Sequence, residues 1–163
     1  MDDLNIRPAT PADDEALWAI LQPVLAAGDT YAWPSHPSRE EGLALLHPHG
    51  GHTCVALRGD QVVGLYVVKA NYGGPGDHVA NAGYMVAPDA RGAGVGEALC
   101  RHSIEFARGF GYRALVFNAV VSTNTGAIRL WQRCGFNIVG TVPAAFRHPL
   151  HGEVAVHVMH RAL

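Results

Sequence analysis

Hydrophobic and polar residues follow two different spacings along this chain. Short apolar, β-branched runs bounded by Gly, Pro, Asn or Asp predict strands, and apolar residues spaced by three or four positions predict amphipathic helices. The predicted strands cover residues 4–7, 53–57, 62–68, 78–87, 114–121, 136–142 and 154–159. The predicted helices begin after Thr10, which can cap the first turn, near Gly94, and after the capping stretch Ser122-Thr123-Asn124, and a further short helix covers residues 38–46.

The order of these elements predicts the fold. The runs 53–57 and 62–68 are joined by a tight hairpin signal, Arg58-Gly59-Asp60-Gln61. The run 78–87, the helix after it and the run 114–121 predict a strand, helix, strand crossover, because residues 114–121 are apolar on both faces, as in a buried parallel strand. We therefore predict one α/β (α+β) domain over residues 1–163. Its mixed, twisted sheet has six or seven strands, with helices on both faces.

The first helix and the loop after it carry two notable features. Pro23 lies inside the helical pattern and should kink or end the helix. Gly28 then opens a loop that carries Tyr31 and Trp33. These aromatic side chains either line a binding pocket or cover the edge of the core, and the sequence favours neither interpretation.

A glycine-rich turn joins the predicted strand 78–87 to the next helix, in the stretch YMVAPDARGAGVG at residues 84–96. Glycines at the first turn of a helix let a ligand approach the backbone, and the unpaired N–H groups there favour an anion. Arg91 adds a full positive charge. A phosphate or pyrophosphate fits this turn best, although a strand-to-helix turn without a ligand has the same pattern.

Two nucleotide-binding motifs do not match this turn. A P-loop requires a lysine followed by Ser or Thr after the glycines, and none follows here. A dinucleotide fingerprint requires a third glycine at the position of Leu99 and an acidic residue after the next strand, and both are missing.

Composition excludes several classes of function. The formal net charge of -2 provides no basic surface for nucleic acid. No apolar run reaches the ~20 residues of a membrane span, and the first residues lack the basic start of a signal peptide, so we expect a cytoplasmic protein. Three widely spaced cysteines without a CxxC pair are typical of buried, reduced thiols. The histidines His47, His49 and His52 lie in a Pro- and Gly-rich loop without cysteines or carboxylates beside them, so we predict no metal site.

A second motif occupies residues 124–136, with the pattern Asn-x-x-Ala-x-x-Leu-Trp-x-x-x-Gly-Phe. Together with the earlier Arg-x-x-Gly-x-Gly loop, it resembles the GNAT superfamily of N-acetyltransferases, in which Tyr often stands at the Trp position. The resemblance covers about the last half of the chain, and the first half agrees in the order of its elements. It implies a GNAT-like fold, acetyl-CoA as the donor and acetyl transfer to an amine.

The resemblance also implies which residues hold the cofactor. The loop 91–96 is expected to bind the pyrophosphate, and the strand before it to pair with the pantetheine arm. Asn124 would contact that arm, and the Ala and Trp of the second motif would flank the thioester, although the same helix positions also suit a packed core. The implied cofactor-binding residues are Met85, Val86, Arg91, Gly92, Ala93, Gly94, Val95, Gly96, Asn124, Ala127 and Trp131.

The chain departs from the family at its acid and base. An indole N–H is too weakly acidic to protonate a leaving thiolate, so Trp131 is expected only to orient or solvate the sulfur. The strand 78–87 has no carboxylate to serve as base and presents Asn81 and Tyr84 instead. Asn118 similarly interrupts the apolar run 114–121. Two amides on adjoining strands predict a neutral polar pocket, unless both are structural amides that pair with the backbone.

This pair of asparagines is similar to that of the yeast-type acetyltransferases that detoxify proline analogues such as azetidine-2-carboxylate. We therefore predict acetyl transfer to a small-molecule amine, with no nucleic acid or membrane partner. Asn81, Asn118 and Trp131 are the candidate catalytic residues, and Tyr31, Asn81, Tyr84 and Asn118 the candidate acceptor-binding residues. Acetylation of a protein N-terminus or an aminoglycoside, a regulatory module that binds acyl-CoA without turnover, and a homodimer all stay open.

Overall fold

The computed structural model describes residues 4–163 and contains a seven-stranded sheet with four α-helices. The strands are β1 (Leu4–Pro8), β2 (His52–Arg58), β3 (Gln61–Ala70), β4 (Val79–Val86), β5 (Ala114–Val121), β6 (Asn137–His148) and β7 (Gly152–Ala162). The helices are α1 (Asp14–Ala27), α2 (Arg39–Leu46), α3 (Val95–Gly109) and α4 (Thr125–Arg133). Short 3-10 turns cover Pro11–Asp13, Gly74–Gly76 and Pro88–Ala90.

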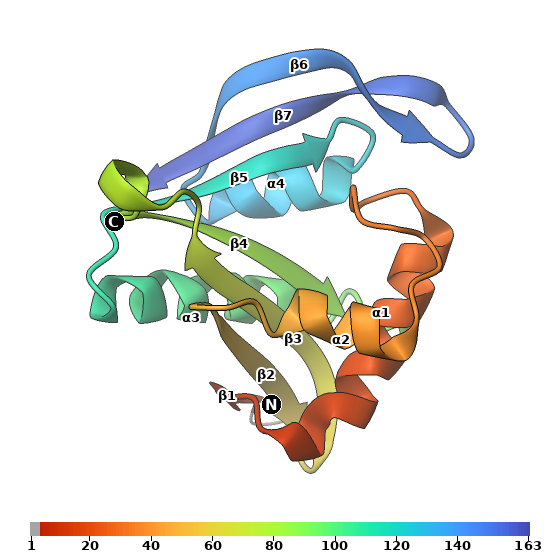
Figure 1. Cartoon of the computed structure of the whole chain (residues 1–163), viewed down its shortest axis with the longest axis vertical. Coiled ribbons are helices and arrows are strands. Elements are labelled where there is room, and N and C mark those ends of the chain that lie inside the picture. The colour runs from red at the N-terminus through yellow and green to blue at the C-terminus, as the bar shows by residue number, and fades with distance from the viewer. Residues whose placement is uncertain (1–3) are drawn as a thin grey trace.

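The sheet has the strand order β1-β2-β3-β4-β5-β7-β6 and is mixed, as predicted. Only β4 and β5 are parallel, and their pairing is short, from Val79 opposite Ala114 to Asn81 opposite Val116. Beyond that point the two strands separate, and the sheet twists so that the β6–β7 hairpin lies across the upper end of the molecule (Figure 1). The gap between β4 and β5 is the feature around which the site is built.

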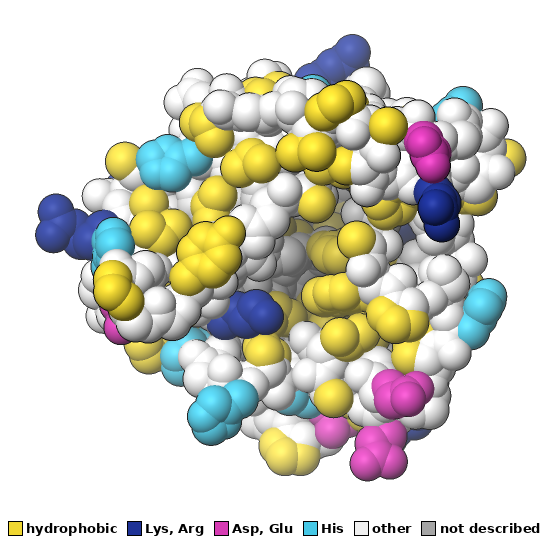
Figure 2. Space-filling model, turned by 45° about the horizontal axis from the view of Figure 1, so that its top comes forward, with side chains coloured by type: hydrophobic (Ala, Val, Ile, Leu, Met, Phe, Trp, Pro, Cys, Tyr) yellow, Lys and Arg dark blue, Asp and Glu magenta, His cyan; other side chains and the backbone are white. Residues whose placement is uncertain are grey.

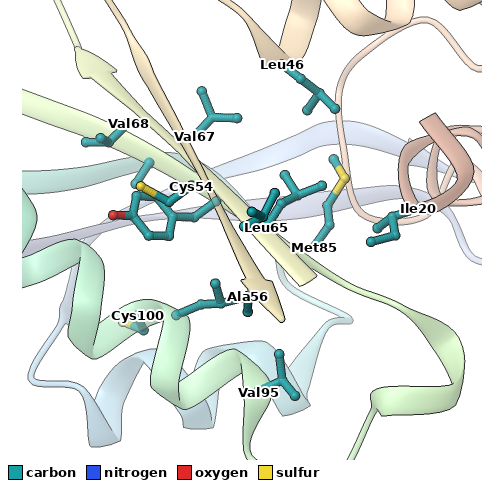
Figure 3. Packing of buried hydrophobic residues seen from close by; sticks show 14 of the residues in the cluster. Ile20, Leu46, Cys54, Ala56, Leu65, Val67, Val68, Met85, Val95 and Cys100 are labelled. Carbon is teal, nitrogen blue, oxygen red and sulfur yellow. The ribbon is translucent and has the colours of Figure 1, made fainter. Parts of the chain in front are cut away.

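Helices cover both faces of the sheet, which confirms the predicted layers. Helices α1 and α2 pack on one face and α3 on the other, and one continuous core of buried hydrophobic residues joins them to the strands. Figure 3 shows Ile20, Leu46 and Met85 on one side of the central strands and Val95 and Cys100 on the other. All three cysteines are buried and free.

Of the two effects expected of Pro23, an end of the helix is wrong. Helix α1 does not end at Pro23 but continues to Ala27, where Gly28 closes it in the left-handed conformation with φ 65°. Pro23 lies on the exposed side of the helix, so water can bind the carbonyl left without a partner, while buried Leu25 holds the last turn on the core.

The residues described contain no helix with both the length and the apolar character needed to cross a membrane.

A partly buried ion pair ties β1 to the start of α1. The Asp13 carboxylate accepts two hydrogen bonds from Arg7, at 2.8 and 2.9 Å, and one from the Thr10 N–H at 2.7 Å. The Asp13 side chain is only 7% exposed. The hydrogen bonds from Arg7 are the main reason that the pKa of Asp13 falls to about 2, since they outweigh the effect of burial.

Replacing Asp13 with alanine is therefore expected to lower the free energy of unfolding by about 2 kcal/mol at neutral pH. Because the folded pKa lies below the unfolded value, this contribution is present above about pH 4 and is lost as the pH falls toward 2. Urea unfolding at pH 7 and pH 2.5 measures both effects. Glu15→Ala, which removes an exposed pair with Arg39 at 3.4 Å, is the matched control and should cost less than about 1 kcal/mol. If the wild type and Asp13→Ala lose the same free energy of unfolding between pH 7 and pH 2.5, the role given to Asp13 is wrong.

Candidate active site

The site begins at an open edge of β4. The Ala87 N–H bonds the Val63 carbonyl of β3, so in an extended strand the backbone groups of Met85 also face β3, and those of Tyr84 and Val86 face β5. Since the ladder between β4 and β5 ends at Asn81, the groups of Tyr84 and Val86 open into the gap. Met85 was expected to offer backbone groups to the cofactor, but its backbone faces β3 and only its side chain reaches the cavities.

A large cavity of about 830 Å³ runs along this gap. Figure 2 shows the molecule hollowed on one face, with mostly hydrophobic side chains around the hollow. The predicted cofactor residues that line the cavity are Met85, Val86, Arg91, Gly92, Gly96, Asn124, Ala127 and Trp131. Ala93, Gly94 and Val95 are not among its lining residues, and the Val95 side chain is buried in the core.

The glycine-rich turn forms the outer end of this cavity. Gly92 and Gly94 have φ values of 75° and 78°, which favour glycine, and no other atom lies within 4 Å of the position that a Cβ would occupy on either. Gly94 caps α3, whose first turn therefore points free N–H groups outward. Gly96 has a different role, because a Cβ there would lie 3.1 Å from the Leu130 side chain of α4. The loop thus combines a backbone that is open to a ligand with a tight helix contact.

Helix α4 supplies the second wall. The Asn124 side chain accepts a hydrogen bond from the Ala127 N–H at 3.4 Å, so Asn124 caps the helix while its NH₂ group stays available. Trp131 packs against Tyr84, with ring centroids 4.7 Å apart, and edge-on against Phe117 at 5.2 Å. Trp131 therefore lines the cavity and also belongs to an aromatic cluster. Both the cofactor-binding and the core-packing interpretation of its position agree with this.

A smaller cavity of about 230 Å³ lies against the face of β4 and β5 that carries Asn81 and Asn118. Trp33 lines it as well, so the loop after α1 contributes to a pocket and, through its packing, to the core edge. The two cavities share a wall where β4 and β5 separate. The shared residues are Thr30, Tyr31, Ala82, Gly83, Met85, Phe117 and Ala119.

The two asparagines are not the equivalent buried amides that the sequence suggested. Asn81 is half-buried and its Nδ2 donates to the Val116 carbonyl at 3.1 Å. Asn118 is exposed, because β5 has left the edge of β4 at this point, and its Nδ2 donates to Asn71 Oδ1 at 2.7 Å. Each amide thus keeps its oxygen free for a ligand.

Tyr31 occupies the gap itself. Its hydroxyl accepts a hydrogen bond from the Tyr84 N–H at 2.9 Å and donates one to the Tyr84 carbonyl at 2.7 Å. Gly83 leaves room for it, since a Cβ there would approach the Tyr31 hydroxyl at 3.3 Å. Burial raises the pKa of Tyr31 to about 12, so the phenol is neutral at physiological pH. Tyr31 therefore replaces the missing strand partner at the junction of the two cavities.

Tyr84, predicted to bind the acceptor, points its hydroxyl to α3 instead. The hydroxyl lies 2.7 Å from Ser103 Oγ, and burial raises the pKa of Tyr84 well above its usual value. Tyr84 lines the larger cavity but not the smaller one. Its backbone groups, and not its phenol, contact Tyr31 at the gap.

Sequence reasoning missed two charged residues on these walls. Asp29 lines the larger cavity, and Lys69 lines the smaller one. Asp29 follows the helix-closing Gly28, where an acidic residue is ordinary in a turn. Lys69 is the only lysine in the chain, and this rarity is the one signal that the sequence offered. In residues 4–163, no three His, Cys, Asp or Glu side chains come close enough together to hold a metal ion.

Comparison with known proteins agrees with this geometry. Residues 16–136 match the model of the acetyltransferase (GNAT) family. N-acetyltransferase aca1 of Schizosaccharomyces pombe is 37% identical over 86 residues, which are 53% of this chain and 41% of that protein. Mycothiol acetyltransferase of Renibacterium salmoninarum is 28% identical over 145 residues, 82% of this chain and 40% of that protein. The chain thus spans about two fifths of the length of these curated relatives.

Among solved structures, a GCN5-related N-acetyltransferase from Kribbella flavida is 47% identical. It superposes with a TM-score of 0.94, and the match covers 98% of both chains. The cavities therefore lie on a fold that this relative shares.

Proposed function

Because the chain belongs to the acetyltransferase (GNAT) family, we propose that it transfers an acetyl group from acetyl-CoA to the amine of a small molecule. One observation carries the proposal. The large cavity has an anion-binding loop at its outer end and an open strand edge along its length, and it meets the small cavity at the gap between β4 and β5. A long donor and a small acceptor can therefore enter by separate routes and meet at one point.

The residues of the large cavity fit acetyl-CoA. Arg91 and the free N–H groups of the turn suit the pyrophosphate, since both favour negative charge. The backbone groups of Val86 at the open edge suit the amides of the pantetheine arm, in the manner of an added strand. Asn124, which caps α4, and Ala127 in its first turn also line the cavity. The ~830 Å³ cavity is also within the usual range of a cofactor site.

The small cavity fits a compact acceptor. The free oxygens of Asn81 and Asn118 accept hydrogen bonds and so suit the N–H groups of an amine. Its volume of about 230 Å³ suits a small acceptor better than an aminoglycoside. We take the acceptor to be a small amino acid, with proline analogues such as azetidine-2-carboxylate as the first candidates.

The chemistry requires the amine to be neutral when its nitrogen attacks the thioester carbon. The C–S bond then breaks, the thiolate leaves, and the proton lost by the nitrogen goes to solvent, because no carboxylate lines the smaller cavity among the described residues.

Trp131→Phe is expected to retain activity within about threefold of the wild type. The ring packs against Tyr84 and Phe117 and lines the cavity, and a phenyl group keeps most of that contact. Steady-state kcat with saturating acetyl-CoA measures the effect. A fall of about 10³-fold in a folded variant would mean that the indole N–H stabilises charge in the transition state.

Thiol release from acetyl-CoA, followed with a panel of amines, tests the function. Release with small amino acids supports the proposal. Release only with a peptide N-terminus or an aminoglycoside would assign those acceptors instead. Tight binding of acetyl-CoA without release with any amine would favour a regulatory acyl-CoA-binding module, a role that the absence of a tyrosine at Trp131 and of a carboxylate on β4 leaves open.

The homodimer stays a prediction. The outer strand β6 leaves Ile138, Val139 and Val142 partly or largely exposed. Analytical ultracentrifugation would show whether two copies of the chain associate in solution.

A further inference from the structure

The smaller cavity has an unbalanced charge. Lys69 is the one charged side chain among its lining residues, and no Asp or Glu within residues 4–163 joins it there. Lys69 is also the only lysine of the chain, in which eleven of the twelve basic residues are arginine. Within the same residues, no carboxylate lies within 4 Å of its ammonium group. The cavity thus presents a positive charge without a protein counter-charge.

The sheet register brings this charge to the asparagines. Lys69 on β3 lies directly opposite Asn81 on β4. Residues opposite one another in an antiparallel pair project from the same face of the sheet, so both side chains are on the face that carries the small cavity. Asn118 lines the same cavity from β5. Three neighbouring strands therefore contribute one polar group each.

The hydrogen-bond acceptors and the charged donor of the small cavity are on different side chains. The Val116 carbonyl can only accept a hydrogen bond, so it must face Asn81 Nδ2 and leave the Asn81 oxygen unpaired. Asn118 likewise donates through Nδ2 and keeps its oxygen. The asparagine oxygens accept hydrogen bonds from an amine, whereas Lys69 only donates and carries the charge. The cavity therefore offers acceptors at one place and a cation at another.

We propose that Lys69 is the specificity-determining residue for the acceptor and binds its carboxylate, while the asparagine oxygens hold its amine nitrogen. This inference rests on the proposed acetyl transfer and adds the group that selects the substrate. A zwitterionic amino acid satisfies both ends of the cavity. A simple amine leaves Lys69 without a partner, and a polyamine meets a like charge.

Matched acceptors and matched variants test the proposal. The acceptors are azetidine-2-carboxylate, which carries the carboxylate, and its carboxamide, which does not. The variants are Lys69→Gln, which removes the charge, and Lys69→Arg, which keeps it. Arg147→Gln is the control for loss of a positive charge, because Arg147 is 90% exposed at the β6–β7 hairpin and lies outside both cavities. Comparing each variant with the wild type on the same acceptor cancels the intrinsic reactivity of the amine.

For Lys69→Gln we expect kcat/KM for azetidine-2-carboxylate to fall at least tenfold, kcat/KM for the carboxamide to change less than threefold, and the KM for acetyl-CoA to stay unchanged. Lys69→Arg should retain most of the activity toward the acid. Equal losses with both acceptors, or no loss with the acid, would overturn the role of Lys69.

Calorimetric binding of azetidine-2-carboxylate in the presence of CoA separates this inference from the proposed function. Binding that depends on Lys69 in a protein that releases no thiol with any amine would retain the carboxylate site and reject the transferase. If the acid is acetylated equally well with and without Lys69, the transferase is retained and the carboxylate site is rejected. If the wild type neither binds nor acetylates the acid, the carboxylate site is rejected as well.

Discussion

Replacing Arg91 with alanine is expected to weaken acetyl-CoA binding by about ten- to a hundredfold without unfolding the protein. Arg91 is exposed at the outer end of the large cavity, beside the free N–H groups at the start of α3. A guanidinium on a phosphate forms charge-assisted hydrogen bonds, which contribute about 1.5–3 kcal/mol. Because Arg91 is outside the core, its removal should leave the thermal unfolding temperature nearly unchanged.

Isothermal titration calorimetry with CoA measures the loss. Arg108→Ala is the matched control, because Arg108 is a partly exposed arginine in the last turn of α3, pairs with Glu105, and lines neither cavity. The difference between wild type and Arg91→Ala should shrink as salt is added, since salt screens the contact between the exposed arginine and the pyrophosphate. Unchanged affinity in the Arg91 variant would remove this residue from the site.

Replacing Asn81 with alanine is expected to lower kcat/KM for the amine at least tenfold, with little change in the KM for acetyl-CoA. The oxygen of Asn81 is the group assigned to hold the amine nitrogen, and the larger cavity does not include this residue. Asn118→Ala should act in the same direction. Asn137→Ala, on exposed β6 outside both cavities, is the control.

The aspartate variants distinguish a ligand contact from a structural amide. Asn81→Asp places a carboxylate oxygen against the Val116 carbonyl, which is unfavourable with or without a ligand. Asn118→Asp is the cleaner test, because its neighbour Asn71 can turn its own NH₂ group toward the new carboxylate. The added charge should oppose binding of a substrate carboxylate nearby. If both alanine variants fold and acetylate small amines at wild-type rates, the asparagines are structural and this acceptor class is wrong.

The same site predicts a dependence on pH. Since no carboxylate base lines the smaller cavity among the described residues, the neutral amine must come from solvent or lose its proton to it. The rate should therefore rise as the pH increases above neutrality toward the pKa of the amine. A plateau already below pH 7 would mean that a protein group takes the proton.

Much of this architecture was predictable because its signals are local. Apolar spacing set most strands and helices to within a few residues, although β6 continues to His148, six residues beyond the predicted 136–142. The glycine-rich turn at residues 91–96 has its form because glycine adopts the φ values at Gly92 and Gly94 at little cost. Asn124 was predicted to cap α4 and does so. The family resemblance rests on these same local motifs, and the match over residues 16–136 confirms it.

Other features depend on residues that only folding brings together. Nothing near Tyr31 in the chain indicates that its hydroxyl would bond the backbone of Tyr84, 53 positions away. The continuation of α1 past Pro23 could not be predicted from helix propensity, because burial of Leu25 outweighs the loss of one hydrogen bond. The unequal environments of Asn81 and Asn118 follow from the point at which β4 and β5 separate.

Lys69 shows most clearly the difference between what the sequence predicts and what folding decides. In the sequence it is one polar residue near the end of an apolar strand, where a solvated lysine is common. The pairing of β3 with β4 places it opposite Asn81, and the separation of β4 from β5 opens the cavity between them. The sequence alone determined the order of the elements and the glycine-rich turn, because dihedral preference and hydrophobic spacing act over a few residues. Tertiary structure alone decided which polar groups share a cavity, because strand register and sheet twist depend on packing across the whole core.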